Sequence, residues 1–189
     1  MTVIASLEAE YKRYKALADA ALGQVGDEEL ARTGPGGSNS LDMLVRHISG
    51  NLRSRFTDFR ASDGEKPWRD RDEEFEPAAA LSRQDLVAAW EEAWSVMFGA
   101  LASLSDADLA ATVTVRGQPL RIDEALHRSL AHTAYHVGQI VYLAKAMRGE
   151  SWRNLSIPRG GSRAYNQAPT NETAAAHTGT LGTPGGRDR

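Results

Sequence analysis

Two histidines in the C-terminal half of the sequence have a spacing that could do chemistry. His132 and His136 lie four residues apart in a segment with helical periodicity, so their imidazoles would lie one turn apart on the same face of a helix. Zinc-protease helices use the same H-x-x-x-H spacing to present two ligands to one metal ion. Thr133 stands where those helices carry their glutamate, so the spacing predicts a metal-binding pair without predicting a protease.

The helical phase of the histidines predicts where they would lie. At about 100° per residue, His132 and His136 fall on one flank of the apolar stripe of their helix. His47 likewise falls away from the centre of the apolar stripe in an earlier helical segment. These positions predict the walls of a cleft at the edge of a helix bundle. Such a cleft suits a metal ion that keeps an open coordination position.

The same histidines also have an ordinary structural interpretation. H-x-x-x-H pairs often arise by chance, and half-buried histidines are commonly satisfied by water and backbone groups; on its spacing alone, His47 fits this interpretation better. His127 lies nearly opposite His136 around the helix, so we predict that it does not share the ligand of His136. His177 lies in a polar C-terminal segment and is predicted to be inert.

Four segments with helical periodicity would position the histidines. Apolar residues recur at spacings of three and four over residues 4–25, 41–59, 86–104 and 122–147. Ser40 is a candidate N-cap of the second helix, and Ser82 with Asp85 forms a candidate capping box for the third. Gly149 suits the position just after the end of the fourth helix.

The connections between the four segments differ in length and character. Residues 26–39 are rich in glycine and hold at most one short turn, whereas residues 61–81 form a long, charged surface crossover with two prolines. Residues 113–122 predict a small hairpin before the last helix. Residues 168–189 contain few large apolar residues, and we predict that they form a disordered tail. The expected fold is therefore all-α, a four-helix bundle over residues 1–167 with a long crossover connection.

The composition limits the function classes. The 189 residues are 41% apolar and 25% charged, with a formal net charge of −3 and no cysteine. Disulfides and sites that use the protein's own thiolate are therefore excluded. There is no basic excess of the kind that nucleic-acid binders show, and no apolar stretch long enough to span a membrane. With an N-terminus unlike a signal peptide, we expect a cytoplasmic protein without nucleic-acid or membrane partners.

Two motifs resemble those of the DinB/YfiT-like superfamily of bacterial metalloenzymes. The segment HTAYHVGQI at residues 132–140 is similar to its last-helix motif, H-x-x-x-H-x-G-Q-I. The segment RHISGN at residues 46–51 is similar to the earlier motif that supplies the first histidine. Spacing and helix order match over roughly residues 1–166. The resemblance implies a four-helix bundle that binds one divalent metal ion, zinc or nickel, through three histidines. The implied ligands are His47, His132 and His136.

Residues 152–166 look like the C-terminal signature of one branch of that superfamily, a branch without an assigned reaction. Two interpretations of this segment have equal weight. It could cover the metal cleft, with Arg159 and Arg163 facing an anion, or it could be a loop that packs Trp152 and Ile157 against the bundle.

The resemblance implies a transferase that uses a low-molecular-weight thiol, such as bacillithiol, mycothiol or glutathione, and a small electrophile. Three neutral imidazoles leave the full positive charge on the ion and at least one coordination position open for water or substrate. Such a centre lowers the pKa of the thiol or water that it binds. Because the chain lacks cysteine, the sulfur would have to arrive on the cosubstrate.

Two other functions stay open at this point. A metal-dependent hydrolase would need a general base, but the two motifs offer only the neutral amides Asn51 and Gln139, unless a carboxylate from the first or third helix reaches the site. A non-catalytic module that binds a metal or ligand in a stress response is the other alternative. The sequence identifies no catalytic residue. It does not fix the oligomeric state either, although it is compatible with a homodimer.

Overall fold

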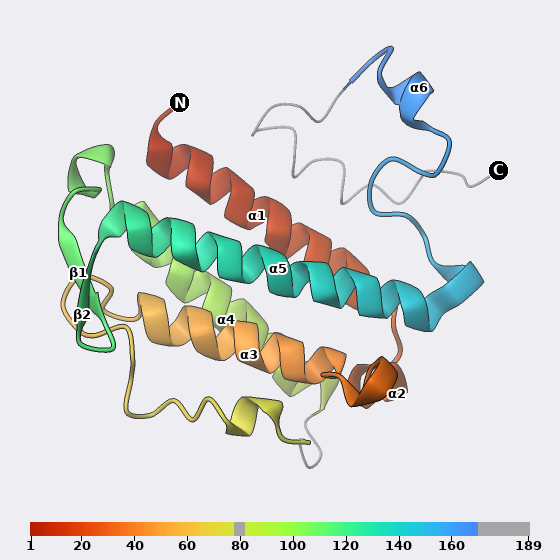
Figure 1. Ribbon diagram of the computed structural model, residues 1–189, viewed down its shortest axis with the longest axis horizontal. Coiled ribbons are helices and arrows are strands. Elements are labelled where there is room, and N and C mark those ends of the chain that lie inside the picture. The colour runs from red at the N-terminus through yellow and green to blue at the C-terminus, as the bar shows by residue number, and fades with distance from the viewer. Residues whose placement is uncertain (78–81, 170–189) are drawn as a thin grey trace.

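The fold is a helix bundle, seen in a computed structural model that describes residues 1–77 and 82–169. Its long helices are α1 (Val3–Leu22), α3 (Leu41–Phe56), α4 (Arg83–Ala102) and α5 (Ile122–Arg148). Helix α1 packs mainly on α5, and α3 packs mainly on α4 and also on α5 (Figure 1). The predicted all-α bundle is confirmed. The predicted tail lies outside the described residues from residue 170 onward.

Short elements connect the long helices. They are α2 (Asp27–Ala31), η1 (Pro35–Gly37), η2 (Glu73–Phe75), η3 (Asp106–Asp108), η4 (Gly149–Ser151), α6 (Ser162–Tyr165) and the strands β1 (Thr112–Val115) and β2 (Gln118–Arg121). The two strands form the predicted antiparallel hairpin, with Val115 opposite Gln118. Its turn residues, Arg116 and Gly117, both have positive φ, at 55° and 71°. Tight two-residue hairpin turns require this conformation, which glycine adopts without strain.

The helix boundaries follow local capping chemistry. The backbone N–H of Asp85 donates to Oγ of Ser82 over 3.1 Å, and Gly149 ends α5 with φ of 53°, both as predicted. Ser40 does precede α3, but its hydroxyl donates to the carboxylate of Asp42 and does not cap the backbone. Helix α3 ends at Phe56, whereas its apolar stripe extends to Phe59, because Thr57 adopts an extended backbone conformation with ψ of 124° and Asp58 a left-handed one with φ of 48°.

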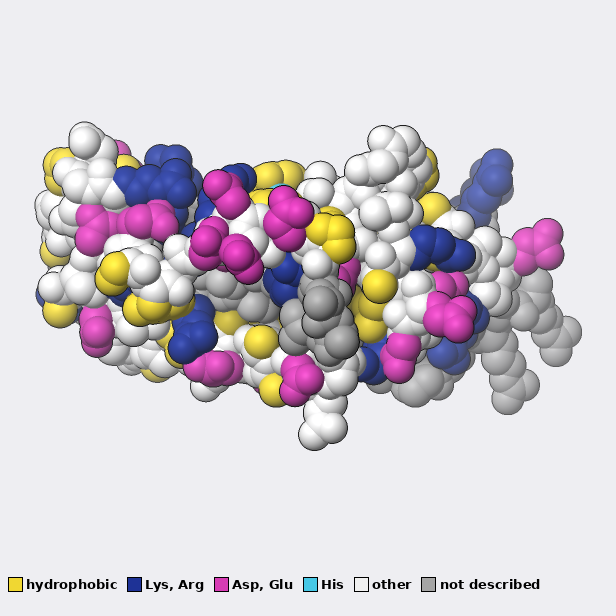
Figure 2. Space-filling model, turned by 90° about the horizontal axis from the view of Figure 1, so that it is seen from below, with side chains coloured by type: hydrophobic (Ala, Val, Ile, Leu, Met, Phe, Trp, Pro, Cys, Tyr) yellow, Lys and Arg dark blue, Asp and Glu magenta, His cyan; other side chains and the backbone are white. Residues whose placement is uncertain are grey.

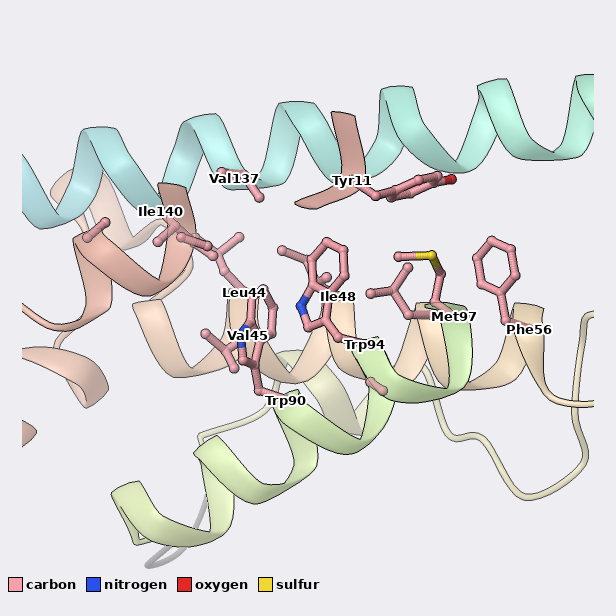
Figure 3. Packing of buried hydrophobic residues seen from close by; sticks show 14 of the residues in the cluster. Tyr11, Leu44, Val45, Ile48, Phe56, Trp90, Trp94, Met97, Val137 and Ile140 are labelled. Atoms are coloured by element: carbon pink, nitrogen blue, oxygen red, sulfur yellow. The ribbon is translucent and has the colours of Figure 1, made fainter. Parts of the chain in front are cut away.

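The core lies where the four apolar stripes meet. Figure 3 shows Trp94 and Met97 of α4 pointing toward Ile48 of α3, with Tyr11 of α1 and Val137 of α5 on the opposite side. Burial of one such large apolar side chain contributes about 1.5–3 kcal/mol to folding. The hydroxyl of the fully buried Tyr11 donates to the carbonyl of Leu126 over 3.0 Å, which satisfies its polar end. Burial raises the pKa of Tyr11.

The crossover between α3 and α4 runs along the outer side of α3 (Figure 1). Arg46 of α3 donates to the carbonyls of Glu73 and Glu76 over 2.8 Å and 2.6 Å, and these bonds hold η2 against the helix. We expected a surface segment, but Lys66 and Glu74 within it are each only 8% exposed. The crossover therefore contributes a wall to the site described below. None of the described helices is long and apolar enough to cross a membrane.

Candidate metal centre

Neighbouring helices bring the three predicted histidines together. His47 comes from α3, and His132 and His136 come from successive turns of α5. One potential ligand atom from each ring lies within 4.8 Å of the other two. The pairing of His47 with the H-x-x-x-H segment is thus present in the fold, although 85 residues separate His47 from His132.

Hydrogen bonds on the outer nitrogens decide which ring atoms face one another. Nδ1 of His47 donates to Oε2 of Glu74, and Nδ1 of His136 donates to Oε1 of Gln139, each over 2.8 Å. Because a neutral imidazole carries one proton, Nε2 of both rings is then an acceptor. Nε2 of His47 lies 3.1 Å from Nε2 of His132, so the acceptors point into the cluster.

Burial favours the neutral form of two of the three rings, those of His132 and His136. His47 is 3% and His136 4% exposed, whereas His132 is half-buried. Burial, reinforced by the neighbouring imidazoles, lowers the pKa of His132 to about 3. Burial likewise lowers the pKa of His136 to about 4, although its bond to Gln139 opposes the shift. Neutral imidazole is the form that binds metal ions.

The cluster can hold a metal ion. Nε2 of His136 and Nδ1 of His132 are buried and have no hydrogen-bond partner among the described residues. Buried polar atoms are rarely left without a partner, and a cation beside Nε2 of His136 would supply one. A set of three imidazoles is typical of zinc and of other borderline divalent ions.

Glu74 and Arg69 of the crossover form the outer layer of the site. Arg69, whose side chain is 2% exposed, donates to both carboxylate oxygens of Glu74 over 2.7 Å and 2.9 Å. Burial alone would raise the pKa of Glu74, but the bonds from His47 and Arg69 hold it below its usual value. Glu74 is therefore an anion that orients His47. Carboxylates hold metal-binding histidines in this way in many proteins.

The hydrolase alternative left open that a carboxylate from the first or third long helix could reach the site. The carboxylate that the structure places beside His47 belongs to the crossover, where Glu74 is one of several acidic residues in an aperiodic run, 70-DRDEEFE-76. Nothing in that run distinguishes Glu74 from its neighbours. One indirect signal lies in Gly50 of the earlier motif: a Cβ there would meet Oε1 of Glu74 at 2.1 Å and its Cδ at 2.9 Å. The helix needs glycine at this position so that Glu74 can reach His47.

A cleft of about 400 Å³ opens beside His47 and His132. Its apolar lining includes Phe56, Phe59 and Leu120. His47 and His132 line the cleft, as their helical phase predicts, whereas His136 is 4% exposed and is absent from the lining. Figure 2, which views the crossover side of the molecule, shows only a small cyan area of histidine surface, consistent with the burial of the rings.

The remaining candidate residues lie away from the cluster. His127 is exposed and bonds through Nδ1 to the carbonyl of Asp123 over 2.8 Å, as its helical phase predicts. His177 lies outside the described residues. Arg159 and Arg163 are exposed and are absent from the cleft lining.

The C-terminal segment therefore does not cover the cleft, because it leaves the bundle at the far end of α5 (Figure 1). Trp152 packs against the core, as the second interpretation of this segment expected. Ile157 is 40% exposed and does not belong to the core.

Fold and site together define a helix-bundle protein with a three-histidine cluster that can hold a metal ion. The chain belongs to the family described as "Protein of unknown function (DUF1572)", whose model matches residues 2–161. No curated protein and no solved structure matches the chain significantly.

Proposed function

We propose that this protein is a divalent-metal-dependent transferase of the DinB/YfiT type, which moves a low-molecular-weight thiol onto a small electrophile. The observation that supports it best is the convergence of His47, His132 and His136, two of which, His47 and His132, line a cleft. The proposed ion is zinc or nickel. The likeness of the two motifs and the proposed cytoplasmic location rest on the sequence, and a homodimeric assembly is compatible with it.

The chain's own residues would hold the ion and shape the space beside it. A divalent ion bound by three neutral imidazoles would lower the pKa of a thiol that approaches it and thereby favour the nucleophilic thiolate. Glu74 and Gln139 fix the orientation of His47 and His136. The Nε2 atoms of these two rings would therefore need little reorganisation to bind an ion. In the proposed reaction the thiol proton passes to solvent, sulfur bonds to carbon, and the leaving group departs with its electron pair.

The surroundings of the cluster favour a transferase over a hydrolase. A hydrolase would normally use a general base within hydrogen-bond reach of the attacking water. Both oxygens of Glu74 are already engaged by Arg69 and His47, and the described cleft lining contains no aspartate or glutamate. A thiol with a pKa lowered by the ion needs no such base.

Cobalt substitution tests the proposal directly. The cobalt-loaded protein is titrated separately with bacillithiol, mycothiol and glutathione. We expect one thiol to add a near-ultraviolet charge-transfer band and the same thiol to support consumption of a chlorodinitrobenzene. If no thiol perturbs the cobalt spectrum and none supports turnover, the transferase proposal falls. Hydrolysis, or metal and ligand binding without turnover, would then take its place.

A further inference from the structure

We infer that the cleft beside the three histidines binds a small organic oxyanion, a carboxylate or a phosphate, whose charged group pairs with Arg128. The inference names the substrate class of the site and in that respect rests on the proposed function. Its basis is the distribution of charge around the cleft.

The charged side chains that line the cleft are all basic apart from the histidines. They are Arg55, Arg69, Arg71, Arg116 and Arg128. The chain as a whole has a net charge of −3, so this lining departs from the composition of the rest of the protein. Figure 2 shows one group of basic side chains at the hairpin end of the molecule and further basic side chains along the rest of this face. A cleft lined by one sign of charge concentrates ligands of the opposite sign.

Carboxylates behind the lining neutralise most of these arginines. Arg69 pairs with Glu74, as described above. Arg55 and Arg116 share Glu65, at 3.3 Å and 2.7 Å, and the carboxylate of Asp63 also interacts with Arg55. Arg71 lies 3.6 Å from the exposed carboxylate of Asp72.

Arg128 differs from the other four arginines. It is exposed, and it makes no hydrogen bond or ion pair with any part of the chain that the structure describes. It lies on α5 one turn before His132, so both side chains belong to the same face of the helix and both line the cleft. Its guanidinium is therefore free to bind an oxyanion whose other end points toward the histidines. A guanidinium can donate two parallel hydrogen bonds to a carboxylate or phosphate.

The apolar part of the lining defines the rest of the ligand. Phe56, Phe59 and Leu120 provide a hydrophobic wall, and Tyr135 lies beside His132 with 5.6 Å between the ring centroids. A volume of about 400 Å³ is in the range of small-molecule sites. The occupant that fits is an organic acid or phosphate ester with a compact apolar or aromatic body.

Calorimetric titration of the metal-loaded protein tests this assignment. The probes are 3-phenylpropionate, phenyl phosphate and the uncharged 3-phenylpropionamide, at fixed pH and ionic strength. We expect at least one anion to bind about ten- to hundredfold more tightly than the amide, the range for a hydrogen-bonded charge pair. Whichever anion binds more tightly identifies the preferred headgroup.

Substitution of Arg128 separates its contribution from that of the metal ion. Arg128→Gln should remove most of the preference for the anion and leave amide binding unchanged. Arg163→Gln, which removes one exposed positive charge away from the cleft, should preserve the preference. Equal binding of anions and amide by the unmodified protein, or an anion preference that survives Arg128→Gln, would overturn the inference. Because no probe contains a thiol, this result is independent of the cobalt titration that tests the transferase.

Discussion

Each histidine of the cluster has a different neighbour on its outer side, and this difference should appear in metal affinity. His47 is held by a buried carboxylate, His136 by a neutral amide, and Nδ1 of His132 has no partner among the described residues. A carboxylate both fixes the ring and makes its inner nitrogen more basic. Glu74 is therefore the outer residue on which the centre should depend most.

Glu74→Gln should weaken metal binding by about ten- to hundredfold, the usual effect of losing such an orienting partner. It should also lower the free energy of unfolding, because Arg69 would stay buried without its counter-charge. Competition with a chromogenic chelator measures the affinity, and Glu73→Gln, at the exposed neighbouring position, is the matched control. Equal affinity in the Glu74→Gln variant and the control would show that Glu74 does not support the centre.

At the scale of the elements, the crossover packs closely against α3 at Gly50, where the Glu74 side chain approaches the helix. Glycine inside a helix costs about 0.5–1 kcal/mol relative to alanine, so its presence there needs a reason. The reason is steric, because Glu74 occupies the space of the missing side chain. Gly99 of α4 offers a comparison, since a Cβ at that position would meet nothing within 4 Å.

Gly99→Ala should therefore stabilise the protein by about 0.5–1 kcal/mol and leave metal affinity unchanged. Gly50→Ala should displace the Glu74 carboxylate. It should therefore weaken metal binding and should not give the increase in stability expected for Gly99→Ala. Denaturant unfolding and chelator competition on both variants measure the two effects. If Gly50→Ala behaves like Gly99→Ala in both assays, the contact between Gly50 and Glu74 does not constrain the site.

Features that depend on nearby residues could be predicted from the sequence, and features that depend on tertiary contacts could not. The shared face of His132 and His136 follows from helical periodicity, and Gly149 could be assigned as a helix end from its residue type. Spacing alone favoured an ordinary role for His47, and only the resemblance of its motif joined it to the other two histidines. Arg128 gave no sequence signal and Glu74 only the indirect one of Gly50, because their roles follow from how the crossover and α5 meet the cleft.

At the scale of the whole molecule, the bundle should be independent of its C-terminal extension. Residues after Ala168 have too little apolar surface to offset the entropy of ordering them. A protein truncated after Ala168 should keep the thermal midpoint and metal content of the full chain. Calorimetry and elemental analysis check this. A midpoint lowered by more than a few degrees would show that the extension contributes to stability.

The central claim is that one divalent ion binds to His47, His132 and His136, and plasma emission spectrometry of purified protein tests it most directly. The full chain should contain about one equivalent of metal. His47→Ala, His132→Ala and His136→Ala should each lose most of it, whereas His127→Ala and His177→Ala should retain it. Unchanged metal content in the variant that lacks all three cluster histidines would contradict the account.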